Sequence, residues 1–178
     1  MTEATPPDQS APDQNAPDKN APDKNEMEEY LRTTFFEMPL HKLLGLRFVE
    51  RDEGRLVVEM PVRQEAFNGS GNLHGGAIAT LVDVAAGSCA ARASGFDAAT
   101  QSLVTADLHV RYLGRPKGDV VRAQAQVVRA GRMLIVVEVR VLDPDDNVIA
   151  VADFSSMVVP RREPLLEGTT TDPSAPDL

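Results

Sequence analysis

The chain has 178 residues, 42% of them hydrophobic, and a formal net charge of −9. This composition fits one soluble domain with tails and excludes a membrane span, because polar residues such as Asp83 and Arg92 interrupt the longest apolar stretch, residues 77–93. A single cysteine, Cys89, excludes an internal disulfide, and with no secretory leader visible we expect a cytoplasmic protein.

The negative charge belongs to the two ends of the chain. Residues 1–26 and 163–178 each carry a net charge of −4, whereas residues 27–162 carry only −1. Both ends are rich in Pro and Asp and offer little to bury. We therefore predict a disordered head over 1–26, a single folded domain over 27–162 and a disordered acidic tail over 163–178.

The sequence of the folded region predicts a helix, a strand, a second long helix and then four strands. The amphipathic run from Met27 to about Leu46 predicts helix on either side of Pro39, covering either the ligand pocket or the outside of a sheet. A strand over 55–62, a loop over 64–72 and a long helix over 75–94 follow. The last predicted elements are four strands, at 103–113, 119–130, 133–142 and 147–159.

Strands on both sides of one helix, without βαβ alternation, predict an α+β domain with an antiparallel sheet. The helix over 75–94 is apolar or small on nearly every side. We therefore expect the sheet to wrap around a buried helix.

Asp83 is the exception in this helix, since its neighbours are Leu81, Val82 and Val84. An aspartate there is either an ion-paired or partly exposed structural residue, or a functional carboxylate. His74-Gly75-Gly76 stands just before the helix, and its glycines either simply turn the loop into the helix or let an oxyanion approach the free N–H groups. The two features together favour a functional site.

The spacing of these residues predicts an assembly. Gly75 and Asp83 are eight positions apart, so at about 1.5 Å per residue they lie roughly 12 Å apart along one helix. One helix cannot easily bring both to one reacting carbonyl. A two-fold dimer with antiparallel helices could place Gly75 of one copy opposite Asp83 of the other; a long ligand touching both in one chain is the alternative.

Residues 111–132 hold six basic residues and one acid. The segment is either a solvated strand face or a seat for a phosphorylated ligand, and with one aromatic residue it fits nucleic acid poorly. The three histidines, His41, His74 and His109, are scattered along the sequence and predict no metal site.

Three segments together resemble the hotdog-fold thioesterases, in particular the PaaI-like acyl-CoA thioesterase branch of the phenylacetate pathway. They are Asn68-x5-His74-Gly75-Gly76-x6-Asp83, Thr105-Ala-Asp-Leu-His-Val-Arg-Tyr112 and Val127-Val-Arg-Ala-Gly-Arg132. The resemblance, which runs from about Leu43 to Val159, implies a hotdog fold of five or six strands around the helix. It also implies a homodimer joined edge to edge, often stacked as a dimer of dimers.

The resemblance also implies roles for single residues. The Gly75 amide and the Asn68 side chain would polarise the thioester carbonyl, while Asp83 of the other copy acts as general base or nucleophile. Thr105 would hold the water, and His74 would support the loop. Contacts to the acyl-CoA substrate are implied for Gly76, Tyr112, Arg115, Lys117, Arg129, Gly131 and Arg132.

The chemistry agrees with these roles, because a thioester can be hydrolysed by a carboxylate, a water and two hydrogen-bond donors, without metal or cofactor. Two alternatives remain at this stage: a non-catalytic acyl-CoA-binding hotdog module, and a hotdog hydratase or dehydratase in which His74 matters more than Asp83. We expect Phe67 and Leu73 to shape the acyl pocket, and the acyl group stays open.

Overall fold

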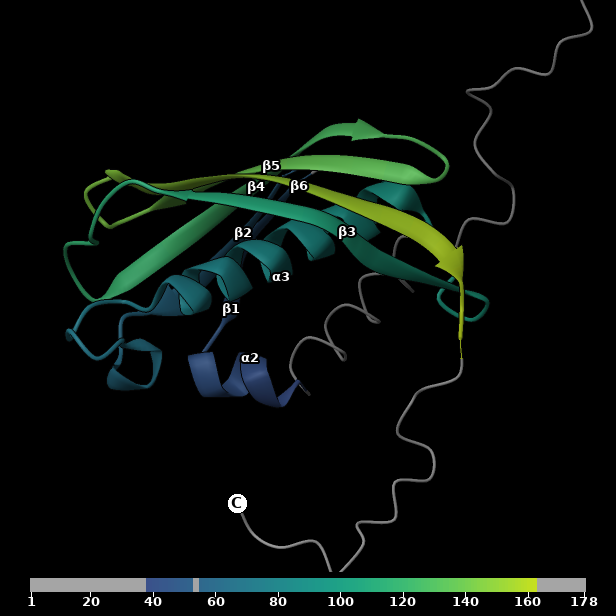
Figure 1. Cartoon of the computed structure of the whole chain (residues 1–178). Coiled ribbons are helices and arrows are strands. Elements are labelled where there is room, and N and C mark those ends of the chain that lie inside the picture. Colours follow the sequence, from purple (N-terminus) through teal and green to yellow (C-terminus); the bar gives the residue numbers. More distant parts are fainter. Residues whose placement is uncertain (1–37, 53–54, 163–178) are drawn as a thin grey trace, which may run out of the picture.

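The computed structural model describes residues 38–52 and 55–162, which form one antiparallel sheet and one long helix (Figure 1). The six strands follow the order β1-β2-β4-β5-β6-β3 across the sheet. The helices are α2 (Pro39–Leu44), a 3-10 turn η1 (Gln64–Ala66) and α3 (Gly75–Ser94). The strands are β1 (Arg47–Asp52), β2 (Arg55–Pro61), β3 (Gln101–Tyr112), β4 (Val120–Ala130), β5 (Leu134–Leu142) and β6 (Val148–Pro160).

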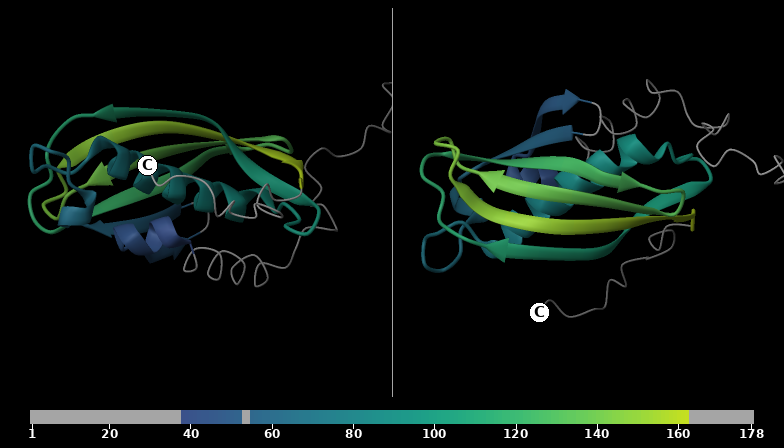
Figure 2. Two further views of the ribbon diagram at one scale, coloured as in Figure 1. Left: turned by 60° about the horizontal axis from the view of Figure 1, so that its bottom comes forward. Right: turned by 90° about the horizontal axis from the view of Figure 1, so that it is seen from above.

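The sheet curves around α3, which lies along its concave face (Figures 1 and 2). One side of the helix packs against the sheet with small and branched residues, about two in each helical turn. Four of them are fully buried: Leu81, Val82, Ala85 and Ala86. Met60 from β2 and Phe154 from β6 are among the sheet residues in the same core. The predicted α+β arrangement is confirmed, and the helix has the predicted bounds.

The other side of α3 is only partly covered by the residues that the structure describes. Thr80, Asp83, Val84, Gly87 and Ser88 are all only half-buried, so the described part of the chain does not bury the helix all round. The sheet reaches only part of the helix circumference. An apolar helix with one side left open indicates that another surface is needed to cover it.

Two segments near the amino terminus of the described region differ from expectation. Helix α2 begins with Pro39 at its first turn and ends at Gly45, whose φ of 65° terminates the helix before Leu46. Strand β1 follows at once and was not predicted, because its sequence RFVERD has little regular alternation. The predicted head (1–26), the first part of the predicted helix (27–37) and the predicted tail (163–178) lie outside the described residues.

Strand β3 lies at one edge of the sheet and pairs with β6. Its twelve residues make it one of the longest strands, and its second edge has no partner among the described strands. An unpaired edge of this length presents a row of backbone donors and acceptors to another chain. In the part of the chain that is described, no helix is long and apolar enough to cross a membrane.

Candidate active site

The start of α3 leaves one backbone donor unused. His74 is the N-cap, and its Nδ1 accepts a hydrogen bond from the Gly76 N–H at 2.8 Å. The Ala77 and Ile78 N–H groups both donate to the His74 carbonyl, at 3.0 and 3.2 Å. Within the described residues this leaves the Gly75 N–H alone without an acceptor in the first turn. It lies at the positive end of the helix dipole, where an oxyanion is favoured.

The two glycines of this turn differ in how much space a side chain would have at each position. A Cβ on Gly76 would lie 2.9 Å from His74 Nδ1, so the cap requires glycine at this position. A Cβ on Gly75 would make ordinary contacts of 3.5 Å with the Tyr112 ring. The fold itself therefore tolerates a side chain at 75, and the glycine there keeps the amide open to an approaching group.

Asn68 is held in the loop that leads into this turn. Its Oδ1 accepts hydrogen bonds from the Ser70 N–H at 3.0 Å and the Asn72 N–H at 3.1 Å. These bonds fix the orientation of the side-chain amide. The Nδ2 group has no partner in the described part of the chain, so it is the portion of Asn68 that remains able to donate to a ligand.

Asp83 lies two turns further along α3 and is half-buried. The Thr105 hydroxyl of β3 donates to its Oδ1 at 2.9 Å. This hydrogen bond uses the single proton of the hydroxyl and fixes the position of Oδ1. The second carboxylate oxygen, Oδ2, remains able to accept a hydrogen bond from a water. The structure thus brings the predicted pair, Asp83 and Thr105, into direct contact.

A β-bulge in β3 sets the direction of these side chains. The pairing of β3 with β6 shifts by one residue between Thr105 and Asp107. Side chains seven positions apart in a regular strand point to opposite faces, yet Thr105 and Tyr112 both bond to α3. The Tyr112 hydroxyl donates to the Gly75 carbonyl at 3.0 Å. The extra residue therefore lets one strand hold both ends of the candidate site.

A hollow of about 370 Å³ opens beside Asp83. Helix α3 and strand β3 form its walls, together with His41 of α2 and Phe96, which follows the helix. Its described lining consists of His41, Asp83, Val84, Gly87, Ser88, Ala91, Phe96, Ser102, Leu103 and Thr105.

The described part of the amino-terminal segment thus helps to close this hollow, and α2 lies on the side of α3 opposite the sheet (Figure 1). Phe67 and Leu73, expected to shape the pocket, are absent from the lining and instead face each other across an isolated β-bridge. Gly87 and Ser88 were missed, although their spacing of four and five positions from Asp83 on the predicted helix already places them near its face.

The predicted basic patch is divided in a single copy. Arg115 and Lys117 lie in the loop before β4, whereas Arg129 and Arg132 lie at its far end and in the next turn. Nine strand residues, 120–128, lie between the two groups and separate them by roughly 30 Å. Arg111 pairs with Asp153 at 3.3 Å. The expectation of one local patch is therefore wrong within a protomer, because residues close in sequence lie at opposite ends of a strand.

Two of the remaining predicted residues have structural partners. The Gly131 N–H donates to the Leu134 carbonyl at 2.9 Å, and a Cβ there would lie 3.0 Å from the same oxygen, so the β4–β5 turn itself favours glycine. The Lys117 N–H donates to the buried Asp143 carboxylate at 3.1 Å. The side chains of Arg115 and Lys117 remain exposed.

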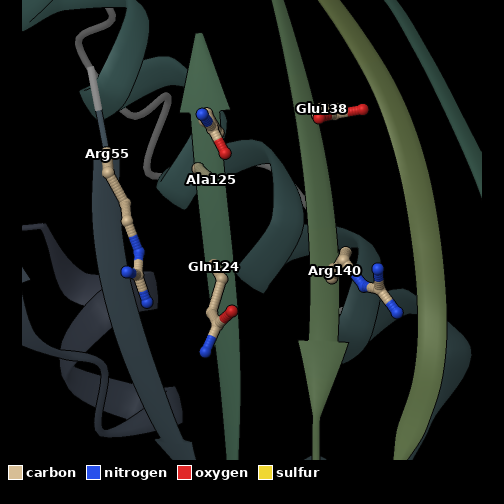
Figure 3. A pocket seen from close by; sticks show the side chains of 6 residues that line it. Arg55, Gln124, Ala125, Glu138 and Arg140 are labelled. Carbon is tan, nitrogen blue, oxygen red and sulfur yellow. The ribbon is translucent and has the colours of Figure 1, made fainter.

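A second hollow, of about 270 Å³, lies on the opposite face of the sheet (Figure 3). Arg55, Gln124 and Arg140 line it from three neighbouring strands, and Figure 3 shows α3 behind them. A ligand in this hollow is separated from Gly75 and Asp83 by the sheet. We therefore assign the candidate site to the helix side.

Cys89 is not a nucleophile in this fold. Burial raises the pKa of its thiol to about 11, although nearby Arg92 acts in the opposite direction. The thiolate is therefore scarce at neutral pH, and the thiol belongs to the core.

The chain is similar to several known proteins. The profile of the thioesterase superfamily matches residues 70–150, a span that includes Gly75, Asp83 and Thr105. The acyl-coenzyme A thioesterase PaaI of Escherichia coli is 32% identical over 111 residues, which cover 61% of this chain and 74% of PaaI. ComA2 of Bacillus subtilis, named only provisionally as an esterase, is 31% identical over 120 residues, covering 67% of this chain and 94% of ComA2.

A crystal structure of a thioesterase family protein from Silicibacter pomeroyi superimposes with a TM-score of 0.67 at 25% identity. The superposition covers 76% of this chain and 99% of that protein. The chain therefore belongs to the thioesterase superfamily, with the hotdog fold and PaaI-like relatives. The enzyme class is thioester hydrolase.

Proposed function

We propose that this protein hydrolyses acyl-CoA thioesters at a site shared between two copies of the chain. The observation that carries the proposal is the pairing, on one helix, of an unused Gly75 N–H with an Asp83 carboxylate oriented by Thr105. The first suits a developing oxyanion and the second suits a water. The naming of the relative PaaI as an acyl-coenzyme A thioesterase supports CoA as the thiol.

In the proposed reaction, Asp83 Oδ2 takes a proton from water as the water oxygen attacks the thioester carbonyl. The Gly75 N–H and Asn68 Nδ2 donate to the oxyanion that forms. The C–S bond then breaks, the acyl group leaves as a carboxylic acid, and the proton on Asp83 goes to the departing CoA thiolate. Direct attack by Asp83, through an anhydride that water then hydrolyses, gives the same products.

The two halves of the site require a second copy. Gly75 and Asp83 are roughly 12 Å apart along α3, which is too far for one reacting carbon. Tyr112 marks the Gly75 end on β3, and Thr105 marks the Asp83 end. If the open edges of two β3 strands pair antiparallel near Leu108 and His109, Tyr112 of each copy stands opposite Thr105 of the other. Each glycine end then faces a carboxylate.

The same pairing reunites the divided basic residues. Strands β3 and β4 run in opposite directions, so the loop with Arg115 and Lys117 lies at one end of the sheet and the turn with Arg129 and Arg132 at the other. An antiparallel dimer inverts the second copy, so its Arg129 and Arg132 come to the same end as the first copy's Arg115 and Lys117. We propose that these four cations share the CoA phosphates. Gly76 and Gly131 would contact the substrate through backbone groups, whereas Tyr112 would hold the Gly75 end of the site in place.

The direct test is to incubate the protein with a panel of acyl-CoAs and to measure hydrolysis as the free thiol that is released. Turnover by the wild-type protein, abolished in Asp83→Asn, is expected. The absence of turnover with every substrate, despite measurable CoA binding, would instead favour the binding-only alternative. Addition of water to an enoyl-CoA without thiol release, kept in Asp83→Asn and lost in His74→Ala, would favour the hydratase alternative.

The shared site has a separate test. Asp83→Ala and Asn68→Ala, each inactive alone, should recover part of the activity when their subunits are exchanged, because one of the two sites in a mixed dimer is intact. Subunit exchange is verified by native mass spectrometry of differently tagged copies. Exchange without recovery would contradict a site built from two chains. A dimer of dimers is a further proposal that the same spectra test.

A further inference from the structure

Gly87 stands in the wall of the hollow beside Asp83, in the middle of α3. Glycine is among the poorest helix formers, and alanine at such a position normally stabilises a helix. A structural reason for glycine is either a left-handed backbone or a neighbour too close for a Cβ. Within residues 38–52 and 55–162 Gly87 has neither, since its φ is not positive and no described atom beyond the local helix backbone lies within 4 Å of a Cβ built on it.

The other helix glycines behave differently. A Cβ on Gly76 would meet His74, and one on Gly75 would meet the Tyr112 ring. The space in front of Gly87 is instead part of the hollow of about 370 Å³ that also reaches Asp83 and Thr105. Gly87 is one helical turn from Asp83, on the same side of α3. The missing side chain therefore enlarges the space next to the carboxylate.

The remaining wall of the hollow indicates what could occupy this space. Val84, Ala91, Phe96 and Leu103 supply apolar surface, while Ser88 and Ser102 add hydroxyls. A volume near 370 Å³ is at the small end of ligand pockets. It has room for a compact acyl group, such as a medium chain or a single ring, and we expect a long fatty acyl chain to fit less well.

We propose that Gly87 is a specificity-determining residue, whose absent side chain makes room for a compact acyl group larger than acetyl. This inference rests on the proposed thioesterase function of the Asp83 site. It predicts that side chains of increasing size at position 87 will exclude larger acyl groups in order of size. The helix itself should gain stability from the first of these changes.

The experiment measures kcat/KM for acetyl-, hexanoyl-, benzoyl- and palmitoyl-CoA with the wild type, Gly87→Ala and Gly87→Val. In the wild type, hexanoyl- and benzoyl-CoA should be the better substrates and palmitoyl-CoA a poor one. Gly87→Val should reduce kcat/KM for hexanoyl- and benzoyl-CoA by about tenfold or more and leave acetyl-CoA within about twofold. Gly87→Ala should lie between them and melt about 2–4 °C higher than the wild type.

Ala93→Val is the matched control, because it adds bulk to the same helix at a half-buried position outside the hollow. It should leave the acyl preference unchanged. An unchanged acyl preference in the Gly87 series, in a wild type that is active, would overturn the inference while leaving the thioesterase proposal intact. Loss of dimer mass in Gly87→Ala, without a change in preference, would also overturn it, because the glycine would then serve contact between copies. A wild type that cleaves none of the four substrates contradicts the proposed function itself.

Discussion

The two ends of the candidate site on α3 are held by different kinds of interaction. At the glycine end, the Gly75 N–H and the Asn68 amide provide the function, and the His74 cap, the Asn68 loop and the Tyr112 hydroxyl hold these donors in place. At the carboxylate end, the side chain of Asp83 provides the function, and one hydroxyl from β3 orients it. The glycine end should therefore be sensitive to changes in local backbone packing, whereas the Asp83 end should be sensitive to changes in a single functional group.

The largest effect is expected at the carboxylate end. Asp83→Asn keeps the shape of the side chain but removes the base, and kcat should fall on the order of 1000-fold with little change in melting temperature. Steady-state thiol release measures the loss. Glu138→Gln, an exposed change on the other face of the sheet, is the control and should be silent. Near wild-type turnover in Asp83→Asn would remove Asp83 from the mechanism.

Substitution of the two glycines by alanine should separate activity from stability at the other end. Gly76→Ala should displace His74 from its cap and lower the free energy of unfolding by about 1–2 kcal/mol. Gly75→Ala should fold nearly as well as the wild type but lose about 100-fold in kcat, since its methyl group obstructs the approach to the amide. Chemical denaturation and kinetics on both variants measure this contrast. Equal destabilisation of the two would show that the turn tolerates neither.

Thr105 tests whether the carboxylate end depends on one hydrogen bond. Thr105→Val removes the donor to Asp83 and should lower kcat about tenfold, whereas Thr105→Ser should retain most of the activity. Both changes keep a side chain of similar size. Equal activity of the valine and serine variants would mean that the hydroxyl does not orient Asp83.

Substitution of Tyr112, at the glycine end, should give the smallest change in kcat. Tyr112→Phe keeps the ring against Gly75 but loses the bond to its carbonyl, so we expect kcat to fall about threefold to fivefold. A role in holding the helix start should change kcat and leave KM for acyl-CoA unchanged. A rise in KM alone would assign Tyr112 to CoA binding instead.

Acid should affect the loop next to the glycine end through Asp143. Burial alone would raise the pKa of this carboxyl, but hydrogen bonds from the Lys117 N–H, the Asn147 side chain, and the Asn147 and Asp145 N–H groups outweigh burial and lower the pKa below 3.8. A lowered folded pKa stabilises the protein above the unfolded value, and this stability is lost as the pH falls below 3.8 toward the folded pKa.

The wild type should therefore lose stability below about pH 4 more steeply than Asp143→Asn, which is less stable at neutral pH and lacks this titration. Thermal melts between pH 3 and pH 7 measure the two profiles. Parallel profiles for the two proteins would contradict this role of Asp143.

The sequence by itself determined the order of the elements from β2 onward, the bounds of α3 and the family to which the chain belongs. These depend on local patterns: strand alternation in 55–62, an apolar run from Gly75 to Ser94 closed by Gly95, and turn residues between the later strands. The residue pattern also selected Gly75 and Asp83 as site residues, and the resemblance to the hotdog-fold thioesterases added Asn68 and Thr105. Their roles remain predictions until the variants are measured.

Only the tertiary structure decided how these residues meet. A one-residue bulge in β3 turned both Thr105 and Tyr112 toward α3. The sequence TADLHVRY contains no glycine or proline that would predict this bulge. The strand direction of β4 divided a basic segment that is continuous in sequence. The hollow beside Asp83 depends on His41, Gly87 and Leu103, which come from three separate elements. Sequence patterns record which face of an element is apolar, but the direction of a side chain and the space in front of it depend on long-range packing.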